Sequence, residues 1–185
     1  MVFAYDTEAT LVFASALVNT LPGASHSRDD ELTDVDSLER LLDGHEYSGR
    51  RDHDEAELDE VRALRREFHR FWEVDRDTAV ELVNRILRDA NALPQLVRHG
   101  DWDWHLHATA AEAPLATRMR VEVAMAFIDV IRTDETDRLR ECEASDCDAV
   151  LIDLSRNRSK RYCDVGNCGN RMNVLAYRAR QAAEA

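Results

Sequence analysis

Apolar residues recur every three or four positions in five segments of the first 132 residues, and polar residues fill the positions between them. This spacing is typical of amphipathic helices that bury one face. We expect a capping role for Asp36 and Asp77 at the starts of the second and fourth helices. The expected helices span residues 8–20, 36–44, 54–74, 77–93 and 112–132.

The helical periodicity also predicts which side chains form the core. The side chains that share the inward faces are Leu11, Ala14, Leu17, Val18, Leu38, Leu41, Leu42, Leu58, Val61, Leu64, Phe68, Phe71, Trp72, Val80, Val83, Leu87, Ala90, Leu115, Met119, Val123, Ala126 or Phe127, and Val130. Together they are enough for one apolar core in the N-terminal part of the chain.

Residues 95–109 follow a different pattern, in which apolar and polar side chains alternate with a period of two. Alternation of this kind predicts a β-hairpin that lies against the helices. We expect its tryptophans, Trp102 and Trp104, to pack inward and its histidines, His105 and His107, to be exposed. The alternative is that the two histidines form a metal-binding or ligand-binding pair, for which a His-x-His spacing alone is weak support.

All four cysteines of the chain lie in one window near the C-terminus, with the spacing Cys142-x4-Cys147 and Cys163-x4-Cys168. Two close pairs separated by a short insert can present four thiolates to one tetrahedral Zn²⁺. Two disulfides and an iron–sulfur cluster are the alternatives. A catalytic zinc ion is disfavoured because four cysteine ligands leave no open coordination position.

The residues around the cysteines predict a small zinc-stabilised unit. Residues 138–142 lead in as a short strand, 149–154 form a strand, 155–159 a turn, and 160–163 a returning strand. A helix follows from Cys168, with Met172, Leu175, Ala176 and Ala179 on one stripe. So few large apolar side chains would hardly fold without metal, and zinc binding supplies on the order of 10 kcal/mol.

The fold class that we expect is therefore mainly α, of the α+β kind. A mainly helical domain with a small β-hairpin would occupy residues 1–137. A treble-clef-like zinc finger, built from a β-hairpin and a helix, would occupy residues 138–185. The polar and acidic run from 133 to 137 marks the boundary.

Charge divides the chain in the same place. The net charge is −13 overall, −15 over residues 1–137 and +2 over residues 138–185. Residues 155–180 hold seven basic side chains and one acid, Asp164. A basic appendage on an acidic body favours an anionic partner. The candidate nucleic-acid contacts are Arg156, Arg158, Lys160, Arg161, Arg171, Arg178 and Arg180.

The chain lacks the roughly 20 consecutive apolar residues of a membrane span. The apolar stretch at 9–18 follows Asp6 and Glu8 and has no basic residues before it, which argues against a targeting signal. We therefore expect a cytoplasmic protein that does not enter membranes, in which the thiols stay reduced and available for metal.

The cysteine window also resembles a known family. Its Ser155-Arg156-Asn157-Arg158-Ser159 turn, Cys168-Gly169-Asn170-Arg171 and Tyr177-Arg178-Ala179-Arg180 are similar to the CGNR zinc-finger proteins. In that family the finger follows an ABATE domain, whose opening motif resembles the stretch that ends in Val18-Asn19-Thr20 here. The resemblance implies zinc ligands at Cys142, Cys147, Cys163 and Cys168. It also implies a DNA-binding transcriptional regulator, often described as stress-related, with no catalytic activity.

Two further roles stay open beside DNA binding. In one, the finger is a protein-interaction or oligomerisation module, and its arginines pair with the acidic body. In the other, the helical domain senses a small-molecule effector. The expected partners are thus DNA, a second copy of the chain and a small molecule. We do not expect an enzyme, because the sequence has no nucleophile–base motif, phosphate loop or dinucleotide fingerprint.

Overall fold

The computed structural model describes residues 2–45, 47–100 and 102–183. Residue 46 of an expected loop, residue 101 of the expected hairpin and the outermost residues of both expected domains (1, 184 and 185) lie outside these ranges. The described chain forms α1 (Tyr5–Val18), α2 (Val35–Gly44), α3 (Glu55–Glu73), α4 (Arg76–Asp89), β1 (Gln95–Val97), β2 (His105–His107), α5 (Leu115–Arg132), the 3-10 helix η1 (Thr136–Arg138), β3 (Leu139–Glu141), β4 (Val150–Ile152) and α6 (Cys168–Ala183). The mainly α fold class with a hairpin-and-helix finger is confirmed.

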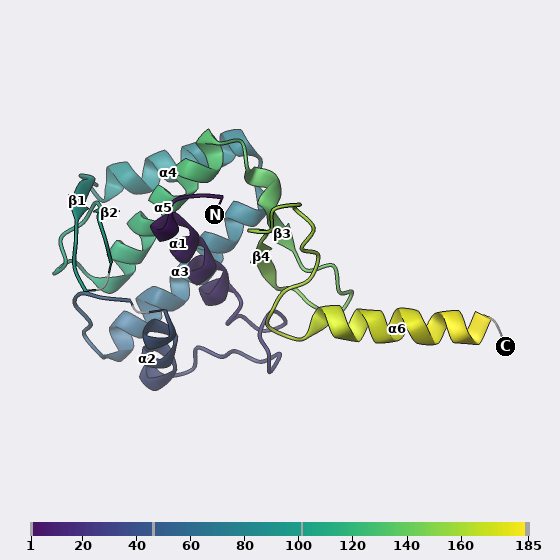
Figure 1. Cartoon of the computed structure of the whole chain (residues 1–185). Coiled ribbons are helices and arrows are strands. Elements are labelled where there is room, and N and C mark those ends of the chain that lie inside the picture. Colours follow the sequence, from purple (N-terminus) through teal and green to yellow (C-terminus); the bar gives the residue numbers. More distant parts are fainter. Residues whose placement is uncertain (1, 46, 101, 184–185) are drawn as a thin grey trace.

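Helix α5 is the centre of the core and packs against α1, α3 and α4 (Figure 1). Its predicted inward face is buried, from Leu115 to Val130. Phe127 of α5 stacks on Phe71 of α3, with their ring centroids 4.0 Å apart. The predicted apolar faces of α1 and α3 are also buried, except that Trp72 is only partly so.

Two of the expected helix caps are wrong by two residues. Asp34 caps α2 by accepting a hydrogen bond from the Ser37 amide (2.7 Å), and Asp75 caps α4 through the Thr78 amide (2.8 Å). Each cap is the first aspartate of an Asp-x-Asp sequence, and the residue in extended conformation takes the role. Asp36 and Asp77 lie instead in the first turns, where their charge favours the helix dipole.

The buried face of α4 differs from the expected one. Ala79, Leu82, Val83 and Ile86 are buried, whereas only Val83 belongs to the predicted stripe. Apolar residues occur on more than one side of this helix, so its contacts with α5 decide which side turns inward.

Strands β1 and β2 form the predicted hairpin, with Leu96 paired to Leu106, but its faces are reversed. His105 is buried and Trp104 is 59% exposed, contrary to our expectation, whereas Trp102 packs as expected and stacks on Tyr5 of α1 with the ring centroids 5.0 Å apart. Trp104 lies outside under the guanidinium of Arg98, whose Cζ is 5.4 Å from the ring centroid. The His105 ring turns inward and bonds the Asp103 carbonyl oxygen through Nδ1 at 2.7 Å.

The second sheet pairs β3 with β4, in the register Arg140 opposite Leu151. The prediction that residues 160–163 return as the partner strand of 149–154 is wrong. The loop from Cys142 to Cys147 is itself the hairpin turn, since the Cys142 amide continues the ladder to the Ala149 carbonyl (2.8 Å). Residues 160–163 run beside this hairpin, where the Glu143 amide donates to the Arg161 carbonyl at 2.9 Å.

Strand β4 belongs to the main core. Val150 and Ile152 are 1% and 5% exposed and lie in the same apolar cluster as the helices. Helix α6, by contrast, extends away from the rest of the molecule (Figure 1), and Cys168 is its one buried residue. None of the described helices is both long and apolar enough to cross a membrane.

Candidate metal centre

The four cysteines converge although they come from separate elements. Cys142 follows β3, Cys147 precedes β4, Cys163 lies in the loop after β4, and Cys168 is the first residue of α6. Their Sγ atoms all lie within 4.8 Å of one another. The Sγ–Sγ distances are 3.7 Å from Cys147 to Cys163 and 3.6 Å from Cys163 to Cys168.

These distances discriminate between the alternatives for the thiols. Four ligands at a Zn–S distance of about 2.3 Å in tetrahedral geometry have sulfurs about 3.8 Å apart, which fits. A disulfide has its two sulfur atoms about 2.05 Å apart, and all four cysteines are free. An iron–sulfur cluster spreads its thiolates around several iron atoms, and so needs wider separations. The donor set therefore fits one closed, four-coordinate ion.

Burial and hydrogen bonds shift the pKa values of the cysteine thiols. Burial raises the pKa of the Cys142 and Cys147 thiols, so metal binding must release their protons. Burial acts the same way on Cys168, but hydrogen bonds from Arg171 and the neighbouring thiols outweigh it and lower its pKa. Arg171 donates to Cys168 Sγ at 3.2 Å, and the Cys163 amide donates to Cys142 Sγ at 3.4 Å.

The metal centre is fastened to the helical body by side chains that bond to β4. Asn19, at the end of α1, donates through Nδ2 to the Val150 carbonyl (2.9 Å) and accepts from the Val150 amide (2.8 Å). Its amide thus pairs with β4 as a neighbouring strand would. Trp72 of α3 donates through Nε1 to the Leu151 carbonyl at 2.9 Å. The domain boundary near residue 137 stays a prediction, and the core is continuous across it.

A buried carboxylate shapes the loop between β4 and Cys163. Asp153 is fully buried and accepts hydrogen bonds from the Ser155 amide (2.9 Å), the Ser155 hydroxyl (2.5 Å) and the Lys160 amide (2.8 Å). Burial acts to raise the pKa of Asp153, but these bonds outweigh it and lower the pKa. Arg138 holds the same loop from the other side by donating to the carbonyls of Asp153 (2.7 Å) and Ser155 (2.9 Å).

Four of the seven predicted nucleic-acid contacts are engaged in ion pairs. The pairs are Arg158 with Glu135 (2.9 Å), Lys160 with Asp164 (2.6 Å), Arg161 with Glu143 (2.5 Å) and Arg171 with Asp146. Their acids come from the finger and from the segment just before it, and none comes from the helices of the acidic body.

The other three predicted contacts, Arg156, Arg178 and Arg180, are exposed. No acidic side chain of the described residues forms an ion pair with them. These three arginines lie on the loop after β4 and on α6.

Sequence reasoning missed the roles of Asn19 and Trp72 in holding the finger. One signal was present, because Asn19 lies in the Val18-Asn19-Thr20 motif that carried the family resemblance. Nothing local to either residue shows that its partner is a strand more than seventy positions away.

Two models of known protein families match the chain. Residues 138–181 match the model of the CGNR zinc finger. Residues 12–134, more than half of the chain, match the ABATE model, described as "Putative stress-induced transcription regulator". The comparison with curated proteins gives no match. The chain therefore belongs to the ABATE family and carries a CGNR zinc finger at its C-terminal end.

Proposed function

We propose that the chain is a cytoplasmic transcriptional regulator that binds DNA through a finger held together by one structural Zn²⁺ ion. The zinc ligands are Cys142, Cys147, Cys163 and Cys168, and the role is binding rather than catalysis. The observation that carries the proposal is helix α6, which extends into solvent with three arginines and no acidic residue.

Helix α6 is poorly supported by its own chain. Isolated helices of about 15 residues are marginal in water, and most helices in proteins are stabilised by packing of one face. Only Cys168 of α6 is buried and Met172 packs partly against the finger, so the metal fixes the start of the helix and residues 173–183 are exposed. A partner that contacts α6 would therefore order it. DNA phosphates suit Arg178 and Arg180, because guanidinium groups bind phosphate bidentately.

The ion pairs within the finger do not preclude this role. Arg161 and Glu143 have side chains that are 60% and 45% exposed, so their attraction is screened by solvent. A phosphate can replace the carboxylate at such a pair. Arg171 differs, because it also bonds Cys168 Sγ, which favours a structural role at the metal centre.

Neutralising the three exposed arginines is expected to weaken DNA binding. In Arg156→Gln/Arg178→Gln/Arg180→Gln, each lost phosphate contact reduces the slope of log K against log salt by about 0.9, or roughly 2.7 in total. Fluorescence anisotropy with duplex DNA over a low-salt series measures both affinity and slope.

The matched control removes the same charge from the helical body. Arg66, Arg85 and Arg88 are exposed on α3 and α4, and Arg66→Gln/Arg85→Gln/Arg88→Gln should leave the slope unchanged. Equal losses of DNA affinity in the two triple variants, or no DNA binding by the parent chain, would contradict the proposal.

A second candidate role is self-association through α6. Val174, Leu175 and Tyr177 are 47%, 53% and 58% exposed, which is unusual for large apolar side chains of one helix. If α6 pairs with a second copy, sedimentation velocity will show a dimer, and Leu175→Lys will shift it to monomer. The same substitution at an exposed body position, Leu93→Lys, should have no effect. A monomer at all concentrations without DNA would rule out this role.

A further inference from the structure

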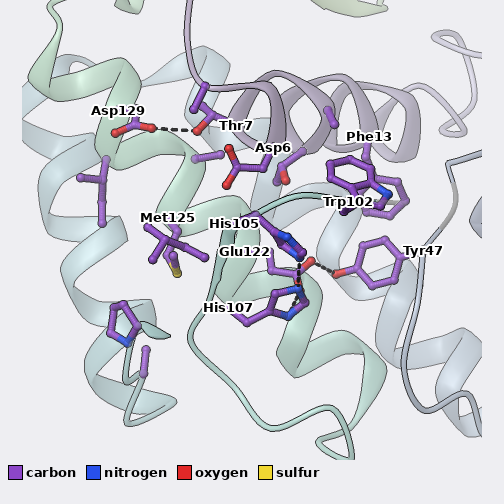
Figure 2. A pocket seen from close by; sticks show the side chains of 18 of the residues that line it. Asp6, Thr7, Phe13, Tyr47, Trp102, His105, His107, Glu122, Met125 and Asp129 are labelled. Atoms are coloured by element: carbon purple, nitrogen blue, oxygen red, sulfur yellow. Dashed lines mark hydrogen bonds and ion pairs between the residues drawn. The ribbon is translucent and has the colours of Figure 1, made fainter. Parts of the chain in front are cut away.

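Three histidines converge in the helical domain, far along the chain from the cysteines. His105 and His107 are the two ends of β2, and His99 lies in the loop between β1 and β2. All three line a cavity of about 510 Å³ beside α1 and α5. Figure 2 shows His105 and His107 side by side in this cavity, next to Glu122 and Tyr47.

The three Nε2 atoms form a nearly equilateral triangle. The distances are 3.0 Å from His105 to His107, 3.2 Å from His105 to His99 and 3.2 Å from His99 to His107. The ring planes are inclined by 62° to 79° to one another, so the rings meet at their edges rather than stack. Each ring thus directs the same nitrogen atom toward a common point.

In His105 and His107 the other ring nitrogen, Nδ1, faces an oxygen acceptor. His105 Nδ1 lies 2.7 Å from the Asp103 carbonyl oxygen, which can only accept, so Nδ1 carries the proton. His107 Nδ1 lies 3.5 Å from a carboxylate oxygen of Glu122. Glu122 in turn accepts a hydrogen bond from the Tyr47 hydroxyl at 2.5 Å. A histidine that binds a metal through one ring nitrogen usually donates the N–H of the other to a carboxylate or carbonyl oxygen, as in this arrangement.

Where two Nε2 atoms at these distances both lack a proton, their lone pairs repel, and a cation between them removes that repulsion. With metal–nitrogen distances of about 2.0–2.1 Å, separations of 3.0–3.2 Å give angles of roughly 90–105° at the metal. The three nitrogens would therefore occupy one face of a tetrahedral or octahedral ion. Imidazole ligands suit zinc, copper, iron and nickel rather than magnesium or calcium.

We infer that His99, His105 and His107 bind one divalent transition-metal ion through Nε2, with at least one coordination position open to the cavity. This site differs in kind from the cysteine centre. Four thiolates enclose their ion, whereas three histidines leave a position for water or for a small ligand with an oxygen or nitrogen donor. The site is independent of DNA binding by the finger.

The test uses the full-length chain with its finger already filled by one equivalent of zinc. Calorimetric titration with ZnCl₂ or CoCl₂ should show that each chain binds one further metal ion, and titration with MgCl₂ should show no binding. Cobalt at this site has only nitrogen and oxygen ligands, so its spectrum should lack the thiolate-to-cobalt charge-transfer band.

Removing one histidine ligand should lower the affinity for the second metal ion. Loss of an outer-shell partner already lowers metal affinity by roughly 10–100-fold, so we expect at least this effect. His99→Gln and His107→Gln are the variants, because His99 is exposed and His107 partly so, and both should fold. The matched control is His69→Gln on α3, which pairs with Glu73 away from the cavity lining.

Three outcomes would overturn the inference. The first is that the zinc-filled chain binds no second metal ion. A proton shared among the imidazoles would then account for the close approach of their nitrogens. The second is unchanged affinity in His99→Gln and His107→Gln, with melting temperatures that show folded protein. The third is a second cobalt equivalent whose spectrum contains the thiolate band.

Discussion

Loss of the cysteine-bound metal should unfold the finger and destabilise the helical domain. In Cys163→Ser, the finger loses a ligand of an ion whose binding contributes about 10–16 kcal/mol at neutral pH. Strand β4 then leaves the core and takes the buried side chains of Val150 and Ile152 with it. Trp72 loses the Leu151 carbonyl as its hydrogen-bond acceptor. Because domains are stable by only about 5–15 kcal/mol, a loss of several kcal/mol should lower the melting temperature by roughly 10–20 °C.

Circular dichroism measures this effect, since the helices of the body dominate the signal. Ser145→Ala is the matched control, because Ser145 is exposed in the same loop between Cys142 and Cys147. Metal content measured on both variants links the shift in melting temperature to the ion. A Cys163→Ser chain that loses the metal but melts like the parent would mean that the finger folds separately from the body.

Asn19→Ala is expected to destabilise the protein by about 2–4 kcal/mol. The substitution leaves the amide and the carbonyl of Val150 without partners, and an unsatisfied buried polar group costs about 1–3 kcal/mol. Urea unfolding followed by circular dichroism gives the free energy of unfolding directly.

Asn84→Ala is the control for this change. Asn84 is exposed on α4, where alanine has the higher helix propensity, so the free energy of unfolding should stay the same or rise slightly. Similar free energies for Asn19→Ala and Asn84→Ala would show that the Asn19 side chain does not join α1 to β4.

Patterns that act over a few residues were predicted correctly from the sequence. The spacing of Leu58, Val61 and Leu64 identifies α3 and its buried face, because a helix repeats every 3.6 residues whatever it packs against. The x4 spacing of the cysteine pairs indicates one metal centre for a similar reason. Loops this short bring two sulfurs together without help from the rest of the fold.

Choices between two locally acceptable arrangements could not be predicted. The hairpin at 95–107 has side chains able to pack on either face, and only its position over the cavity turns His105 inward and Trp104 outward. Residues 160–163 suit a strand, yet β3 takes that place beside β4 because the Cys142–Cys147 loop is already a hairpin turn.

The sequence by itself determined the helices, the clustering of the four cysteines and the division of charge between the body and the C-terminal window. These follow from spacing and composition, which do not depend on distant neighbours. Only the tertiary structure decided that Asn19 and Trp72 hold β4, that α6 stands free, and that three imidazoles meet at one point. Each of these depends on which elements pack together, and packing joins residues whose separation along the chain carries no signal.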